Sequence, residues 1–361
     1  MARNNFKLIG KIQLGKETEK FKPYKVSKSA KGWIGHRLSF GLKNITGFHN
    51  LELFAGYMED GTSLIYCIQK KENYSDETVK LQIKWEDRNN PEIIEQVSDY
   101  NKMSIKINEE EKVYISGYDF LEDVYKLLQD ENMKDKTFCI TGDVEYQEYE
   151  GKVYRKLHPR HIELVSDDTK QTSLLNLELY YTKNAVATEL FEDTKKYFVD
   201  TYVAQYDSEL KEDVYMKEEV VIDVSKAQTP AQEKAFDIIK NRFVVEEEDK
   251  VIKLGVKAIL VNGREKKQIT MEDLTDEERD LIECGLATFE DLAAEYGNQI
   301  NGDSISEIKV VGFGYGYNKG SQETGISPSR LSKVNDELDD MFDNDMFGDD
   351  SLEDDLLPFT N

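Results

Sequence analysis

The order of short alternating segments in the first 165 residues restricts the fold more than any other feature of the sequence. Apolar and polar residues alternate as in strands at 5–15, 36–44, 49–57, 63–69 and 78–85. A helical pattern follows at 118–132, with Phe120, Val124 and Leu127 on one face. Residues 136–165 then predict two long strands joined by a turn at Glu150–Gly151. We therefore expect a mainly β unit that contains one long helix.

This order matches a small Greek-key barrel of the OB type, in which a helix lies between the third and fourth strands. Other sheet-rich domains have the same order of elements, so the pattern alone leaves them open. The sequence favours a fold that is mainly β with some helix (α+β), with an OB-type Greek-key barrel in residues 1–166. Residues 166–173, SDDTKQTS, predict a short linker.

A second cycle of similar elements follows the linker. The expected elements are strands at 174–182, 198–206 and 214–224, a helix from residue 229, helical patterns at 271–297 and a last strand at 305–316. The pair Asn262–Gly263 predicts the turn of a hairpin within residues 251–270. We expect residues 174–316 to form a second OB-like domain in tandem with the first, although no residue-level repeat links the two cycles.

The last segment of the chain has a different composition. Gly, Ser and Pro are frequent from residue 317 to 330, and residues 331–361 hold eleven acids against Lys333, a net charge of −10. Too little apolar surface is present in 317–361 to offset the entropy of an ordered chain, so this segment is predicted to be disordered.

Charge is distributed unevenly along the chain. The whole sequence has a net charge of −25, yet residues 1–50 hold eleven Lys and Arg against two acids, a net charge of +9. A basic head on an acidic chain indicates a polyanionic ligand, and the acidic tail is able to compete for the same surface.

The basic residues of the head are interleaved with aromatic residues between positions 21 and 40. Single-stranded nucleic acid requires cations along its phosphates and flat rings on which its bases stack. The alternative is a solvated lysine loop whose rings pack on the barrel. The candidate DNA-binding residues of this segment are Phe21, Lys22, Tyr24, Lys25, Lys28, Lys31, Trp33, Arg37 and Phe40.

A second cluster of cations and rings occurs on the last predicted strand of the first unit. It holds no acid between residues 151 and 162, and on that strand it is expected to lie beside the first segment. An edge strand protected by charge is the ordinary alternative. The candidate DNA-binding residues of this cluster are Lys152, Tyr154, Arg155, Lys156 and Arg160.

Other classes of function have little support in the sequence. It has no GxxxxGK[ST], HExxH or GxSxG motif, so we expect no enzyme, no catalytic residue and no cofactor. The three cysteines form no CxxC pair and share no zinc-like spacing with the four histidines, so no metal site is expected. No apolar run is long enough to span a membrane and no signal sequence precedes the first strand, which predicts a cytoplasmic protein.

The end of the tail, DDLLPF, resembles the acidic tip of bacterial and phage single-stranded DNA-binding (SSB) proteins, which ends in Asp-Asp-Ile-Pro-Phe or close to it. The resemblance implies an OB-fold core that binds single-stranded DNA. It also implies a tip that recruits replication, recombination and repair proteins. The implied partner-binding residues are Asp354, Asp355, Leu356, Leu357, Pro358 and Phe359.

This chain departs from the SSB pattern in three ways. Thr360 and Asn361 follow Phe359, whereas the family's Phe is usually the last residue and docks through its carboxylate. Residues 1–316 exceed the usual single domain, which suggests an enlarged phage-type member acting in the host cytoplasm. The tail also resembles that of T4-like phage helix-destabilising proteins, but their zinc site has no counterpart here.

The expected function is therefore binding and protection of single-stranded DNA without strong sequence preference during phage DNA replication and recombination. An RNA-binding protein is an alternative, because stacking does not distinguish the two sugars. A virion or scaffold protein that docks through its tail, and a nuclease or ligase with an OB accessory domain, also remain open. Self-association is compatible with each of them.

Overall fold

The computed structural model describes residues 4–18, 21–71, 78–268, 270–295, 299–314 and 321–332. The fold is mainly β, as the sequence predicts, with one large sheet that winds through both halves of the chain and a separate two-stranded sheet. The tail residues 333–361 lie outside the described residues, and so does every predicted partner-binding residue from 354 to 359.

The described residues of the first half form ten strands and two α-helices. The strands are β1 (Asn5–Leu14), β2 (Tyr24–Lys28), β3 (Trp33–Asn44), β4 (Gly47–Met58), β5 (Leu64–Ile68), β6 (Lys80–Lys84), β7 (Met103–Ile107), β8 (Glu110–Tyr114), β9 (Thr137–Tyr149) and β10 (Lys152–Val165). The helices are α1 (Pro91–Gln96) and α2 (Gly117–Gln129), with 3-10 turns at Trp85–Asp87 and Asp99–Asn101.

The second half contains seven strands and five α-helices in its described residues. The strands are β11 (Thr172–Tyr181), β12 (Val186–Ala187), β13 (Lys196–Asp207), β14 (Glu212–Asp223), β15 (Ile252–Gln268), β16 (Gln299–Phe313) and β17 (Gln322–Glu323). The helices are α3 (Phe191–Thr194), α4 (Pro230–Asn241), α5 (Asp276–Glu283), α6 (Phe289–Glu295) and α7 (Ser329–Ser332), with 3-10 turns at Val224–Lys226 and Met271–Asp273.

Five strands of the first half form a closed ring. β1 pairs with β3 and with β9, β3 pairs with β4, and β9 pairs with β10. β10 closes the ring by lying beside β4, where His158 Nδ1 donates a hydrogen bond of 3.2 Å to the backbone oxygen of Glu52. Helix α2 lies between the third and fourth ring strands in the chain and buries Phe120, Leu121 and Val124.

The second half repeats this circuit with its own strands. β11 pairs with β13 and β15, β13 pairs with β14, β16 pairs with β15, and β14 pairs with β16 in parallel at Val221 and Lys309. Helix α4 again stands between the third and fourth ring strands, and it begins at Pro230 behind the cap Thr229, as predicted.

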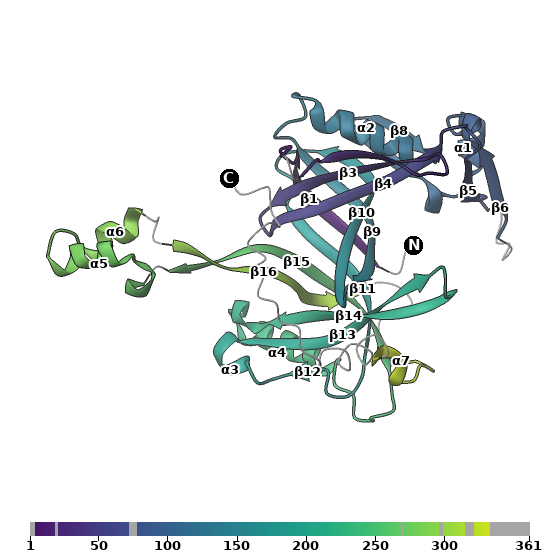
Figure 1. The fold of residues 1–361 in the computed structure, drawn as a ribbon. Helices are drawn as coiled ribbons and strands as arrows, with labels where there is room; N and C mark the ends of the chain where they lie inside the picture. The colour runs from purple at the N-terminus through teal and green to yellow at the C-terminus, as the bar shows by residue number, and fades with distance from the viewer. Residues whose placement is uncertain are drawn as a thin grey trace.

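β1 joins the two rings. Its residues Asn5–Ile9 pair with β9 on one side and with β11 on the other, so one strand belongs to both halves (Figure 1). One continuous hydrophobic cluster extends from Phe6 and Leu8 through both rings. The two halves are therefore packed as one body around a shared core.

The predicted hairpin turn at Asn262–Gly263 is wrong, because both residues lie within the long strand β15. Asn262 meets Gly47 at the start of β4, and a Cβ at residue 47 would lie only 1.3 Å from the Asn262 backbone oxygen. At Asn262 and Gly263 the antiparallel partner of β15 is the distant strand β16. In Figure 1 the β15–β16 ribbon extends away from the body and carries α5 and α6 at its end.

Part of the segment that the sequence predicts to be disordered, from residue 317 onward, lies within the described residues. Residues 321–332 are described, and within them β17 pairs with β15 and α7 packs on β14. Leu331 is 2% exposed and belongs to a small cluster with Tyr180, Tyr215 and Val251. This apolar anchor, which a composition argument does not show, fixes the chain to the second half.

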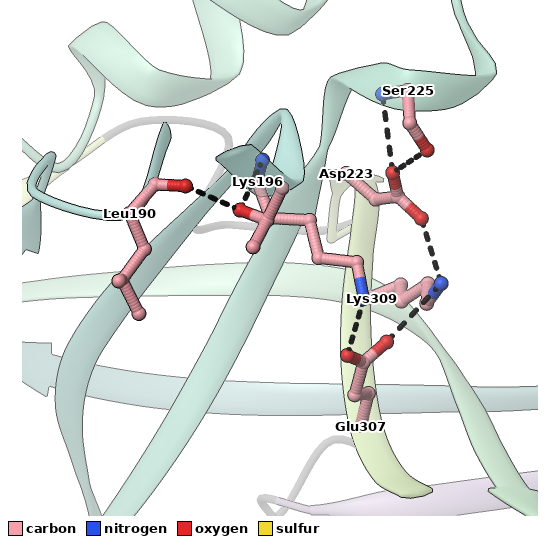
Figure 2. A network of polar contacts seen from close by, with 7 residues as sticks. Leu190, Lys196, Asp223, Ser225, Glu307 and Lys309 are labelled. Carbon is pink, nitrogen blue, oxygen red and sulfur yellow. Dashed lines mark hydrogen bonds and ion pairs between the residues drawn. The ribbon is translucent and has the colours of Figure 1, made fainter. Parts of the chain in front are cut away.

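A network of charges stabilises the closure of the second ring (Figure 2). Lys309 Nζ lies 2.6 Å from Asp223 Oδ2 and 3.1 Å from Glu307 Oε2, and Lys196 Nζ donates to Glu307 Oε1 at 2.7 Å. Burial opposes ionisation of Asp223, but hydrogen bonds from Lys309 and Ser225 lower its pKa below the usual range. The network thus links β13, β14 and β16.

We expect Lys309→Met to reduce the free energy of unfolding by about 3 kcal/mol, because it leaves the buried Asp223 carboxylate without its cation. Urea denaturation at neutral pH measures this loss. Since the pKa of Asp223 is lowered in the fold, its contribution is present above the unfolded-state pKa and is lost as the pH falls through the folded value. Lys217→Met, which removes an exposed pair with Asp200, is the control and should have little effect. Equal losses would contradict this role of the network.

A buried polar network connects the two halves around His49, which is fully buried. His49 Nε2 lies 2.8 Å from Ser173 Oγ and 3.0 Å from Thr46 Oγ1, and Nδ1 lies 3.2 Å from Asn262 Nδ2. Because the amide nitrogen Nδ2 of Asn262 can only donate, His49 Nδ1 accepts and the ring is neutral. Burial, and then the charge of Arg155, lower the pKa of His49 to about 4.

Stability should therefore fall on acidification. Between the unfolded pKa of 6.5 and the folded value of about 4, the unfolded chain binds one more proton at His49, so the free energy of unfolding rises with pH across this window. The full contribution is about 3 kcal/mol. We expect His49→Asn to flatten the pH profile of urea unfolding between pH 4 and about 6.5. A profile with the wild-type slope would contradict this assignment.

Candidate functional site

Strand alternation separates two faces on β3 and β4. His36, Leu38 and Phe40 of β3 are buried, as are Leu51 and Leu53 of β4. Because neighbouring residues of a strand point to opposite sides, the residues between them form an outward face. This surface, called here the β3–β4 face, consists of Trp33, Gly35, Arg37, Glu52, Phe54, Gly56 and Met58.

Two rings dominate the β3–β4 face. The indole of Trp33 lies over Gly35 and Gly56, where a Cβ would come within 2.2 and 2.4 Å of its ring carbons. Phe54 is 52% exposed, and its ring centroid lies 5.5 Å from that of Trp33. The guanidinium of Arg37 lies 5.4 Å from the centroid of the Phe54 ring. The sheet therefore supports an exposed aromatic surface with a cation beside it.

Exposed cations surround these rings. Lys25 lies opposite Arg37 in the β2–β3 pair and so shares its face, and Lys31 lies in the turn between the two strands. Neither forms an ion pair with a residue that the structure describes, nor does Lys152 on β10. These three ammonium groups are available to an anionic ligand.

The remaining lysines of the segment form ion pairs at exposed positions. Lys28 Nζ lies 2.6 Å from Glu59, and Lys22 Nζ lies 3.8 Å from Glu17. Phe21 beside Lys22 is half-buried. The lysine and glutamate side chains are all more than half exposed, so each ion pair contributes little and can be replaced by a ligand phosphate.

Two rings predicted to bind DNA point inward, and the structure corrects both predictions. Phe40 is 1% exposed and belongs to the core. Tyr24 stacks on Tyr125 with ring centroids 4.5 Å apart, and its hydroxyl donates to Glu122 and lies 2.7 Å from His36 Nδ1. Burial, and then the hydrogen bond to Glu122, raise the pKa of Tyr24. Strand alternation places both side chains on the side of the sheet that faces the core and helix α2.

The second basic cluster divides between the two sides of β10. Tyr154 is 46% exposed, and Lys156 Nζ lies 3.6 Å from Glu52 on the β3–β4 face. Arg155 points toward the second half, where Nη1 donates to Glu218 at 2.9 Å and both side chains are 15% exposed. Arg160 is paired with Asp143. Tyr154 and Lys156 extend the candidate site, whereas the charges of the two arginines are neutralised within the protein.

The structure adds rings that the sequence did not single out. A groove of about 520 Å³ begins at Trp33 and includes Tyr66, Trp85 and Tyr118 in its walls. Phe54 could have been found from the sequence. Leu51 and Leu53 mark the buried side of the strand, so alternation predicts that the aromatic side chain of Phe54 faces solvent. No pattern in the sequence indicates the groove, because its walls come from segments that are separate in the chain: β4, β5 and the start of α2.

The second ring does not repeat this site on its equivalent strands. β13 and β14 carry Asp200 and Glu219 opposite each other there, and burial followed by the neighbouring Asp200 raises the pKa of Glu219. These carboxylates repel a polyanion, because both are negatively charged. The candidate site is therefore confined to the first half.

Comparisons with known proteins give little further information. The chain matches no protein-family model and no curated protein. Among solved structures it is similar to a crystal structure of a deletion mutant of the single-stranded DNA-binding protein from Thermus aquaticus. That likeness covers 72% of this chain and 87% of the other, with 10% sequence identity and a TM-score of 0.30. A likeness this distant carries no argument. No helix of the described residues is long and apolar enough to span a bilayer.

Gly35→Ala should lift the indole of Trp33 from the sheet, because the added Cβ would lie 2.2 Å from a ring carbon. The chain has two tryptophans, so a Trp85→Phe background leaves Trp33 as the single emitter. We expect acrylamide quenching of Trp33 to increase in Gly35→Ala. Gly263→Ala, where nothing lies within 4 Å of the added Cβ, is the matched control. Equal quenching in both variants would contradict the described position of the ring.

Proposed function

We propose that the chain binds single-stranded DNA on the β3–β4 face of its first half. The observation that carries this proposal is the ring pair of half-buried Trp33 and exposed Phe54, with Lys25, Lys31 and Arg37 around it. Bases of a single strand stack on such rings while cations contact the phosphates between them. A duplex hides the flat faces of its bases, so the same surface selects against it.

The strand circuits support an OB-type barrel in each half, with domains at 1–166 and 174–316 followed by the tail. In each circuit the first strand pairs with the second and fourth, and a helix precedes the fourth strand. β3 and β4 are the second and third strands of the first ring. These are the strands on which OB folds bind oligonucleotides, which agrees with the position of the rings.

The chemistry of the face favours binding with little sequence preference. Rings stack on every base, and the exposed lysines contact phosphates rather than base edges. We infer a non-enzymatic, cytoplasmic protein that protects single-stranded DNA during replication, recombination and repair, as in a phage. The acidic tip Asp354–Phe359 would recruit the partner proteins, as its resemblance to SSB tips implies.

Fluorescence anisotropy with a labelled oligo(dT) tests the proposal. We expect Phe54→Ala to weaken binding about 10-fold, because one stacked base contributes roughly 1–3 kcal/mol. Lys25→Ala should reduce the slope of log affinity against log salt by about 0.7. Tyr206→Ala, which removes a tyrosine that is 59% exposed on β13, is the control and should bind like wild type.

Competition with unlabelled RNA and duplex DNA completes the experiment. Stronger competition by RNA than by single-stranded DNA would assign the face to RNA. Absence of binding at low salt, or equal effects of Phe54→Ala and Tyr206→Ala, would overturn the proposed site.

A further inference from the structure

We infer that the groove beside Trp33 is a nucleobase-binding subsite, into which the single strand continues from the β3–β4 face. This surface, called here the aromatic groove, lies between β4, the β5–β6 hairpin and the start of α2. The inference rests on the proposed function and adds to it a direction, because it says where the strand goes beyond Trp33.

The size and lining of the aromatic groove suit a base. Its volume of about 520 Å³ lies within the roughly 300–1,000 Å³ typical of small-molecule sites. Four of its lining residues are aromatic, and none of the lining residues in the described part of the chain is charged. The four aromatic lining residues are Trp33, Tyr66, Trp85 and Tyr118.

The absence of carboxylates from this lining distinguishes it from three other surface hollows of the described residues. The hollow over β7, β8 and α2, the hollow between α1 and α2, and the hollow beside α4 each contain three or more Asp or Glu. In a chain with 72 acids, an uncharged hollow that adjoins the cationic strands is the one that a polyanion can approach.

Two of the four rings have their contacts within the protein and form a wall. Trp85 stacks on Tyr57 with ring centroids 5.2 Å apart, and the Arg88 guanidinium lies 4.3 Å from its ring centroid. Tyr118 meets Tyr57 edge to face at 4.9 Å. Arg88 Nε also donates to Asp119 at 2.8 Å, which ties this wall to helix α2.

The other two rings are placed to receive a base. Trp33 lies flat on its glycines and belongs both to the β3–β4 face and to the groove. Tyr66 on β5 is 66% exposed, and its ring neither stacks on nor meets edge to face the ring of another described residue. A base that leaves Phe54 therefore meets Trp33 and then Tyr66 without crossing a charged residue.

The β5–β6 hairpin that carries Tyr66 is held in place by its own small core. Cys67 and Ile83 of the hairpin pack with Val97 and Ile115, and all four are buried. The backbone nitrogen of Ser98 donates to the Ile68 oxygen at 2.8 Å. The outer wall of the groove is thus formed before any ligand arrives, which reduces the entropy lost on binding.

The two tryptophans of the chain both line the groove, so intrinsic fluorescence reports on it directly. In Trp33→Phe, Trp85 is the single emitter and lies off the β3–β4 face. We expect saturating oligo(dT) to change Trp85 emission in this variant. The same oligonucleotide, labelled, gives the affinity independently by anisotropy.

A second variant tests the ring at the rim of the groove. Tyr66→Ala should weaken oligo(dT) binding about 10-fold, as expected for the loss of one stacked base, while Tyr206→Ala leaves it unchanged. The loss should shrink as the oligonucleotide is shortened, because a short strand occupies the β3–β4 face alone. Circular dichroism of each variant verifies that the fold is retained.

The outcomes separate the two proposals. Binding by anisotropy with unchanged Trp85 emission and a wild-type affinity of Tyr66→Ala would overturn the groove and leave the β3–β4 face intact. Absence of binding to any single-stranded oligonucleotide would overturn both. An equal loss for Tyr66→Ala at all lengths would also contradict a subsite beyond Trp33.

Discussion

The pairing of β1 on both of its edges is the interaction on which the rest of the structure depends. Residues Asn5–Ile9 hydrogen-bond with β9 and β11, and the second part of the strand turns to pair with β3. Phe6 and Leu8 from this strand are buried in the core that both halves share. One strand thus closes the first ring, aligns the second ring against it and fixes the orientation of β3, which carries Trp33.

The two rings share a strand circuit but differ in surface chemistry. The first presents Trp33, Phe54 and cations on its second and third strands, whereas the second presents carboxylates there. In the second half, buried charge pairs such as Lys309–Asp223 stabilise the ring closure instead. The same strand circuit therefore carries the proposed DNA-binding face in one half and a charge network that stabilises the sheet in the other.

Strands β1, β3, β4, β5, β6, β9 and β10 were predictable from the sequence because alternation is a local signal, and so were the start of α4 and the helical segments α5 and α6, whereas β2, β7 and β8 were not predicted. The errors involve partners that are distant in the chain. The Asn262–Gly263 pair resembles a turn, but β16 and Gly47 hold it in an extended strand.

The sequence predicted the region of the candidate site, but not which side chains of that region face outward. Lysines and rings between residues 21 and 40 indicated the region, but the inward phase of Phe40 and the contact of Tyr24 with α2 became visible only with the strand register. Phe54 and the glycines beneath Trp33 belong to the same face through cross-strand neighbours. A single sequence does not show those neighbours.

The ion pairs of Lys28 with Glu59 and of Lys156 with Glu52 have a consequence for the solution behaviour of the face. These carboxylates act as built-in counterions. If single-stranded DNA binds here as proposed and a phosphate displaces one of these carboxylates, the freed glutamate attracts a cation from solution, which offsets a cation released from the nucleic acid. The net number of ions released is then smaller than the number of phosphate contacts, so the complex tolerates changes in ionic strength better than its count of cations implies.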